Sequence, residues 1–535
     1  MTDRRALPLQ RRHRTAPRHR HAVAVLAAAV LAAACSDGSV SSVRSDESAA
    51  PTTSASVPTS PTSSEPSTTS APEPAPWDTT ITWESFGVDT EVETGTMEVP
   101  VDYRDPSKGT FTLFLARHLA DESKRIGSLL VNPGGPGFGG SDLAIFADQI
   151  YSPALLRHFD IIGWDPRGTG QSTPAIDCIT DYDRYFAGTD ITPDTDSERQ
   201  LLTDLAAEFA GTCEAENSDI IQFVGTNDSA RDIDSIRRAL GEQTISYFGF
   251  SYGSELGATW ATMFPDTVRA AVLDGASDPA AGFLAESLQQ SIGFEQSITA
   301  FLAWCSANDS CQFNSDGNAE QAFDELMADI DERPVPSVDG RPDVTRSMAL
   351  TAVAYSMYDE SLWRQLGRAL DSARYGDGEL LLQLYDNYFQ RRDDGTYDNS
   401  LEAFQTIVCM DTADRPTIVE EDVAAGAIRR SAPRFSPGTV GSYFCTFFPE
   451  TVEPRIDIGG AARIPILVIG TTGDPATPLS STRAMADALY DGRLVVVEAD
   501  QHTGYGVNQC SIDVVDRYLL DPLGGAPADE TECSD

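Results

Sequence analysis

Between residue 78 and the end of the chain, short apolar runs alternate with longer segments in which apolar residues recur at helical spacing. The short runs are rich in β-branched and aromatic residues, and several of them are separated by helical segments. This alternation is typical of a mainly parallel sheet with helices packed against it. We therefore predict an α/β fold with strands at residues 111–117, 128–131, 159–164, 244–248, 268–273, 464–469 and 494–498.

Residues 276–455 show only the helical pattern. Apolar residues such as Leu362 and Leu366 recur in them every three or four positions, and no run there reads as a parallel strand. We expect this segment to form a helical cap inserted between core strands 6 and 7 of the fold, which are the strands at 268–273 and 464–469. The core would then comprise residues 78–275 and 456–535, and the cap would lie above the strand ends.

Residues 1–34 have the composition of a signal peptide. Arginines are frequent up to Arg20, and the apolar run at 22–34 is too short to span a bilayer. The run ends in Leu-Ala-Ala-Ala and resembles a bacterial lipobox, so we expect Cys35 to be lipidated on the outer face of the cytoplasmic membrane. The alternative is cleavage at an Ala-x-Ala site, which would leave a soluble secreted protein. Residues 35–77 are almost entirely Ser, Thr, Pro, Ala and acidic, and should form an extended tether.

The charge and the cysteine content fit an exported protein. The formal net charge is −44, and so acidic a surface argues against nucleic-acid binding, which needs a basic footprint. Eight of the nine cysteines follow Cys35, and in an oxidising compartment they can form disulfides. None of them has metal-site spacing with histidines, so we expect no metal and no cofactor. Proximity along the chain favours the pairs Cys178–Cys213, Cys305–Cys311, Cys409–Cys445 and Cys510–Cys533.

The motif Gly-x-Ser-x-Gly occupies residues 249–253, with Ser251 at its centre. The expected strand at 244–248 precedes it, and a helical segment with small residues on one face follows. A serine on a sharp turn between a strand and a helix is lifted above the sheet edge with its hydroxyl exposed. We therefore predict that Ser251 is a catalytic nucleophile, although the same motif also forms ordinary glycine-rich turns.

A serine hydroxyl needs a neighbouring base to take its proton. In folds with this turn, the acid and the histidine follow the serine in the chain. His502 is the only histidine after Ser251 in the sequence, so it is the predicted base. Asp474 follows the expected strand at 464–469 and is the predicted acid, accepting the imidazole Nδ1–H. Asp500 is too close to His502 along the chain to orient it.

The negative charge that develops during acyl transfer needs backbone N–H donors. One donor should be the N–H of Tyr252, directly after the nucleophile. The other should come from the glycine-rich loop that follows the strand at 128–131, where Gly134 and Gly135 are the candidates and Gly135 is favoured.

Taken together, these motifs resemble the tripeptidyl-aminopeptidase branch of the prolyl-aminopeptidase-like serine peptidases (family S33) of actinobacteria. That branch includes mycobacterial lipoprotein proteases of similar layout. The resemblance implies an α/β-hydrolase fold, a Ser-Asp-His triad and cleavage of short peptides, such as tripeptides, from a free N-terminus. The segments that carry it are NPGGPG at 132–137, DPRGTG at 165–170, GFSYG at 249–253, GDPATP at 473–478 and HTG at 502–504.

An aminopeptidase needs an anion to hold the α-ammonium group of its substrate. Glu255, Asp278 and Asp411 are the candidates, although each could equally be a helix cap, a surface charge or part of a structural ion pair. The expected partner is a peptide or protein substrate, with membrane contact only through the lipid anchor. An esterase or lipase on the same triad is the alternative, since a fold does not fix a substrate. A non-catalytic binding module is a third possibility, and the intact catalytic positions argue against it.

Overall fold

The computed structural model describes residues 80–87, 91–187, 193, 195–392, 394–413, 415–435 and 443–534. The predicted signal peptide, Cys35 and the whole predicted tether lie outside the described residues. In the described part of the chain, no helix combines the length and the apolar character that crossing a membrane requires.

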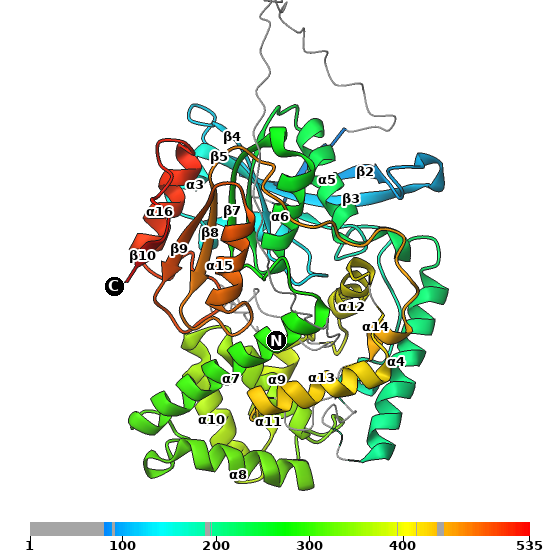
Figure 1. The fold of residues 1–535 in the computed structure, drawn as a ribbon, viewed down its shortest axis with the longest axis vertical. Helices are drawn as coiled ribbons and strands as arrows, with labels where there is room; N and C mark the ends of the chain where they lie inside the picture. Colours follow the sequence, from blue (N-terminus) through cyan, green and yellow to red (C-terminus); the bar gives the residue numbers. More distant parts are fainter. Residues whose placement is uncertain are drawn as a thin grey trace, which may run out of the picture.

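One sheet joins the strands of the described residues in the order β1-β2-β3-β5-β4-β6-β7-β8-β9-β10 (Figure 1). The pairs β1–β2, β2–β3 and β3–β5 are antiparallel, and the other pairs are parallel. The strands are β1 (Thr82–Ser85), β2 (Val92–Pro100), β3 (Thr110–His118), β4 (Gly127–Asn132), β5 (Phe159–Asp165), β6 (Ile245–Phe250), β7 (Val268–Asp274), β8 (Ile466–Thr471), β9 (Gly492–Val497) and β10 (Thr531–Cys533).

The mainly parallel α/β architecture predicted from the sequence is confirmed. Each expected strand is present, with ends that differ by one or two residues. The antiparallel edge formed by β1 and β2 was not predicted, because β2 interrupts its apolar positions with Gly95 and Glu98. Strand β10 was missed because a three-residue strand leaves no periodicity to detect.

Helices cover both faces of the sheet, because side chains of a strand point alternately to its two sides. In β4, Leu130 joins one apolar cluster with α5, α6 and α15, whereas Leu129 and Val131 join another with α1, α3 and α16. The helices around the sheet are α1 (Ser141–Ile145), α2 (Ala147–Ile150), α3 (Pro153–His158), α5 (Thr226–Ala239), α6 (Tyr252–Met263), α15 (Leu479–Ala488) and α16 (Gln509–Leu520).

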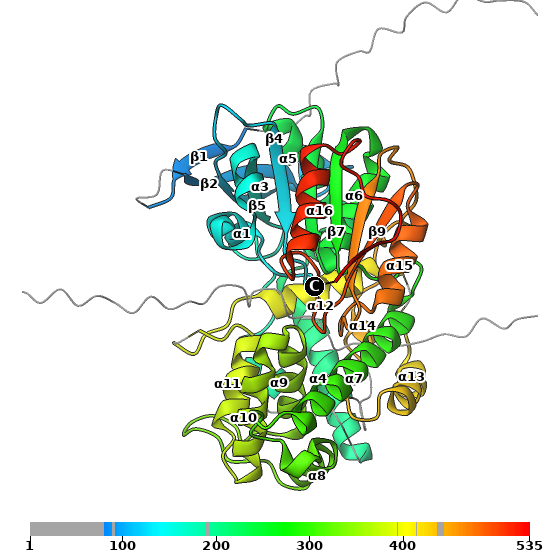
Figure 2. The same ribbon diagram turned by 90° about the vertical axis from the view of Figure 1, so that its left-hand side faces the viewer.

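Between β7 and β8, the described residues form helices and no strand of the sheet. Most of these helices share a separate apolar cluster and lie below the sheet in Figures 1 and 2. Helix α4 (Asp196–Glu216) precedes β7 in the chain but packs against α14 in this helical layer, which the sequence did not indicate. The limits 276–455 therefore stay a prediction. The inserted helices are α7 (Phe283–Ala307), α8 (Ala319–Glu332), α9 (Arg346–Met357), α10 (Trp363–Arg374), α11 (Glu379–Tyr388), α12 (Ser400–Asp411), α13 (Ile418–Ser431) and α14 (Phe444–Phe447).

In the described part of the chain, four disulfides connect separate elements of the fold or join a helix end to the turn after it. They join the segment after β5 to α4, the end of α7 to the following turn, α12 to α14, and α16 to β10. Such bonds stabilise a fold mainly by restricting the unfolded chain. The bonded pairs are Cys178–Cys213, Cys305–Cys311, Cys409–Cys445 and Cys510–Cys533, the pairs that proximity favoured.

Candidate active site

Ser251 lies on the turn between β6 and α6, with φ 54° and ψ −129°. A positive φ is uncommon for a residue other than glycine and persists only where the surroundings impose it. Gly249 permits the turn, because a Cβ at this position would overlap the backbone of Gly253. The backbone N–H of Ser251 donates to the carbonyl of Asp274 at 2.8 Å. The hydroxyl is therefore presented from a strained, fixed turn at the carboxyl end of a central strand.

Asp474 lies in the loop after β8, His502 lies in the loop after β9, and their side chains are in contact. The imidazole Nδ1 of His502 lies 2.9 Å from each carboxylate oxygen of Asp474, and both side chains are buried. A carboxylate only accepts, so Nδ1 carries the hydrogen of this bond. Asp474 also accepts from the N–H groups of Ala476 at 2.9 Å and Thr477 at 2.8 Å, and from the Thr477 hydroxyl at 3.0 Å. These donors fix the carboxylate that orients the ring.

With Nδ1 protonated, the Nε2 atom of His502 is the proton acceptor of the ring. This atom is buried and has no hydrogen-bond partner among the described residues. A buried polar atom without a partner calls for an explanation, and hydrogen bonds between catalytic groups are often made only in the complex with substrate. Gly275 leaves room for the ring, because a Cβ there would lie 2.9 Å from His502 Cε1.

The glycine-rich loop after β4 lies against the nucleophile. A Cβ on Gly134 would lie 2.9 Å from Ser251 Cβ and 3.1 Å from the nitrogen of Tyr252. The N–H of Gly134 already donates to Asn132 Oδ1 at 2.9 Å, which favours Gly135 as the donor from this loop. Tyr252 is the first residue of α6, where backbone N–H groups have no acceptor within the helix. The two expected donor segments are thus brought together at Ser251.

Two of the three candidate amine-binding carboxylates lie near this turn, Glu255 buried and Asp411 partly buried. Glu255 lies one helical turn after Ser251, accepts from Arg455 Nε at 2.8 Å and from the Ser277 hydroxyl at 3.0 Å. Asp411, at the end of α12, accepts from the N–H of Thr226 at 2.7 Å and from its hydroxyl at 2.6 Å. Burial raises the pKa of Asp411 to about 7.

Asp278 is partly exposed. It accepts from the N–H of Ala280 at 3.0 Å and from Gln289 Nε2 at 3.1 Å. Its carboxylate therefore stabilises the start of the connection to α7, as a turn residue does.

Glu286, in the first turn of α7, was missed by the sequence analysis. Burial, and then repulsion from Glu255, raises the pKa of Glu286 to about 8, while Arg455 acts in the opposite direction. We call Glu255, Glu286 and Asp411 the acidic cluster. Arg455 is the cation that interacts with all three of these carboxylates. An acidic residue in the first turn of a helix is common, so the sequence carried no signal for Glu286.

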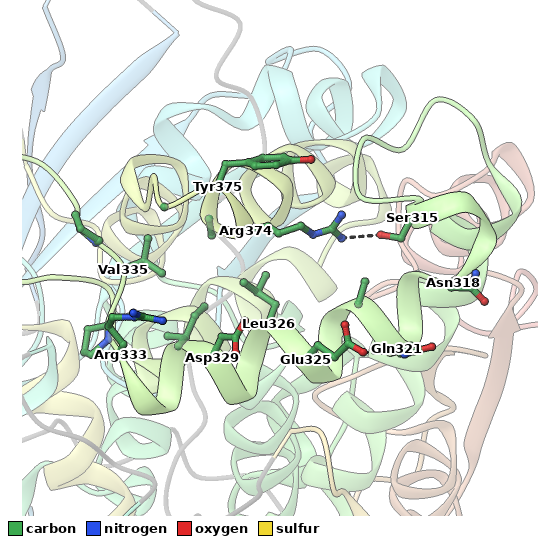
Figure 3. A pocket seen from close by; sticks show the side chains of 16 residues that line it. Ser315, Asn318, Gln321, Glu325, Leu326, Asp329, Arg333, Val335, Arg374 and Tyr375 are labelled. Atoms are coloured by element: carbon green, nitrogen blue, oxygen red, sulfur yellow. Dashed lines mark hydrogen bonds between the residues drawn. The ribbon is translucent and has the colours of Figure 1, made fainter.

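A separate cavity of about 660 Å³ opens in the helical layer between α8 and the end of α10. Figure 3 shows Glu325 and Asp329 of α8 on one side and Arg374 and Tyr375 on the other. The residues that line this cavity include none of the candidate site residues. The Ser251 site is therefore distinct from it.

A strained serine between β6 and α6, followed by a buried Asp–His pair, is the arrangement of a serine hydrolase. Residues 127–509 match the α/β hydrolase fold family. Serine protease Hip1 of Mycobacterium tuberculosis is 33% identical over 463 residues, covering 82% of this chain and 86% of that protein. Carboxylesterase B of Mycobacterium tuberculosis is 34% identical over 493 residues, covering 87% and 92%. Tripeptidyl aminopeptidase of Streptomyces coelicolor is 27% identical over 475 residues, covering 85% and 86%. The chain belongs to the α/β-hydrolase family, and the predicted resemblance is confirmed.

Proposed function

We propose that the protein is a serine peptidase that works through a covalent acyl-enzyme on Ser251. The observation that carries the proposal is the buried Asp474–His502 bond, which leaves Nε2 as the proton acceptor of the ring, without a hydrogen-bond partner among the described residues. Asp474 would hold the imidazole in this tautomer and stabilise the imidazolium that forms.

The reaction follows from these roles. Ser251 Oγ attacks the scissile carbonyl carbon, its proton passes to His502 Nε2, and the carbonyl oxygen becomes an oxyanion. The N–H groups of Tyr252 and Gly135 would stabilise that oxyanion. The C–N bond then breaks, and Nε2 returns the proton to the leaving amine. Water attacks the acyl-enzyme with His502 as base, and Ser251 Oγ is released with a proton.

We further propose that the substrate is a peptide with a free N-terminus, as the name of the Streptomyces coelicolor relative suggests. The acidic cluster supports this, because its three carboxylates share the single positive charge of Arg455. The pKa of Glu286 is raised to about 8, so its carboxyl group ionises readily at neutral pH only when a new cation lies beside it, and an α-ammonium group would supply that cation. Glu286, on the inserted helix α7, is the carboxylate we assign to this group.

The name of Carboxylesterase B favours a second candidate, an esterase on the same triad. Ester hydrolysis uses the same nucleophile, base and oxyanion donors, and differs in having no need for an ammonium-binding carboxylate. The presence or absence of a carboxylate contact with a substrate ammonium group therefore distinguishes the peptidase from the esterase.

We propose that the protein is exported and held at the cell envelope through a lipid on Cys35, with residues 35–77 as a tether. The secreted, lipid-free form is the alternative. Mass spectrometry of the mature N-terminus separates them, since a chain that begins at Cys35 without a lipid would refute the anchor.

A fluorophosphonate probe tests the catalytic assignment. Labelling of the wild-type protein, and its loss in Ser251→Ala, is the expected result. Labelling that survives the substitution would overturn the role of Ser251.

Tripeptide amides with free and with blocked N-termini then test the aminopeptidase. We expect turnover of the free peptide only, and Glu286→Gln should raise its KM about tenfold because an ammonium–carboxylate contact is lost. Glu379→Gln is the matched control, since Glu379 also lies in the first turn of a helix but is exposed. Equal turnover of free and blocked peptides would favour the esterase.

A further inference from the structure

Asp274 is a fully buried carboxylate that the proposed reaction does not use. It is the last residue of β7, and β7 lies between β6, which leads to Ser251, and β8, which leads to Asp474. Asp274 therefore ends the strand that lies between the strands leading to Ser251 and to Asp474.

Three hydrogen bonds connect Asp274 to both sides of that triad. Its carbonyl accepts from the backbone N–H of Ser251 at 2.8 Å. Its carboxylate accepts from the backbone N–H groups of Gly504 at 2.7 Å and Tyr505 at 2.8 Å, one on each oxygen. These two amides belong to the turn that begins at His502. Asp274 thus binds the turn of Ser251 through its backbone carbonyl and the turn after His502 through its side chain.

The turn after His502 needs such support. Thr503 has φ 67°, which is unfavourable for a β-branched residue. A strained residue keeps its conformation only when its surroundings over-determine it. The N–H of Thr503 lies 3.4 Å from an Asp474 oxygen, and the next two N–H groups are bound by Asp274. Loss of the Asp274 contacts would let this turn relax and would move the imidazole.

We infer that Asp274 is a positioning residue for the hydrolytic reaction. It fixes the turn of His502 relative to Ser251, and its negative charge stabilises the imidazolium that forms during proton transfer. This inference rests on the proposed function, because it assigns Asp274 a role only if Ser251 and His502 react together.

The protonation state of the Asp274 carboxyl group depends on its burial and on the charged groups around it. Burial raises its pKa to about 7, and the titratable groups that face it are His502 and Asp474, from the loops after β9 and β8. When the carboxyl group is protonated, the oxygen that carries the hydrogen no longer accepts well from its backbone N–H. The turn of His502 then loses one of its two acceptors and the nearby negative charge.

Asp274→Asn tests the inference. The amide keeps one acceptor oxygen but places N–H donors against the other backbone N–H. We expect kcat/KM for p-nitrophenyl acetate to fall about tenfold through kcat, since small displacements of a catalytic group lower the rate strongly. The acid limb of the pH profile should move to lower pH by about 0.5–1 unit, because loss of a nearby negative charge lowers the pKa of an imidazole.

Glu421→Gln is the matched control. Glu421 is also a buried carboxylate that accepts from a backbone N–H, that of Tyr443 at 3.1 Å, and its substitution should leave both the rate and the acid limb unchanged. An Asp274→Asn protein that folds and keeps the wild-type acid limb would overturn the inference. An inactive wild-type protein, or an active Ser251→Ala variant, would instead overturn the proposed function.

If Asp274→Asn shows no cooperative unfolding transition, the wild-type protein decides. Just below pH 7, log(kcat/KM) should fall with a slope above one, since protonation of Asp274 lowers the rate in addition to the loss caused by protonation of the base. A slope of one down to pH 5 would overturn the inference.

Discussion

The backbone carbonyl of Tyr358 accepts a hydrogen bond from the backbone N–H of His502 at 3.1 Å. The two rings also meet edge to face, with centroids 5.3 Å apart. Tyr358 directly follows α9, a helix of the inserted layer. The proposed base is therefore held from the core by Asp474 and from the inserted layer by Tyr358.

Replacement of Tyr358 should lower the rate without unfolding the protein. Edge-to-face ring contacts contribute about 0.5–1.5 kcal/mol, so Tyr358→Ala should lower kcat/KM for p-nitrophenyl acetate about threefold to tenfold. Tyr358→Phe keeps the ring and should lose less. Equal losses in the two variants would show that the ring contact with His502 does not matter.

Asp474→Asn should lower kcat/KM about 10³–10⁴-fold, because an amide no longer holds the imidazole in the tautomer with Nδ1–H. Asp500 provides the matched control, since it lies two residues before His502 and is partly exposed. Asp500→Asn should change kcat/KM by less than about twofold. Comparable losses in both variants would contradict the assignment of Asp474.

Gly275→Ala tests the space that the imidazole occupies. Gly275 has φ 70°, and its Cβ would lie 2.9 Å from His502 Cε1; Gly376 has φ 87° and would meet nothing within 4 Å. Both alanine variants should lose about 1–2 kcal/mol of stability from the left-handed backbone, measured by urea unfolding. Only Gly275→Ala should also lower kcat/KM, by about tenfold or more.

The stability of the protein should fall between about pH 4.5 and pH 8. Burial raises the pKa values of Asp274 and Asp411 from 3.8 to about 7, and those of Glu286 and Glu421 from 4.5 to about 8. Between the unfolded and folded pKa values the folded protein binds more protons than the unfolded chain, so the free energy of unfolding decreases as pH rises. Thermal unfolding across this window measures the effect.

Glu421→Gln should make that pH dependence weaker, because one of the four titrating groups is removed. A wild-type protein whose stability rises across the window would contradict the raised pKa values of these four carboxyl groups. So would a Glu421→Gln variant with an unchanged pH dependence.

The central strands and Ser251 could be predicted because their signals are local. A fully buried strand is a continuous apolar run, and the turn at Ser251 needs glycines at fixed positions around it. His502 could be identified as the base by elimination, since no other histidine comes after Ser251 in the sequence.

The remaining features depend on contacts between distant segments. Glu286, Asp274 and Tyr358 are ordinary residues in sequence, and only the packing of α7, β7 and α9 brings them to the site. The position of α4 in the helical layer has the same cause. No periodicity along the chain encodes which surfaces meet, so these could not be predicted.

The inserted helices leave the sheet after β7 and return through a segment that runs along α5 and α6 to reach β8. On this return path the N–H of Arg455 donates to the carbonyl of Asp411 at 3.0 Å, and that of Gly459 donates to the Thr262 hydroxyl at 3.2 Å. The layer is also attached to the core through α4 and the Cys178–Cys213 bond. We therefore expect discrimination among substrates to rest on a constant aperture, with the same size limit before and after a substrate arrives.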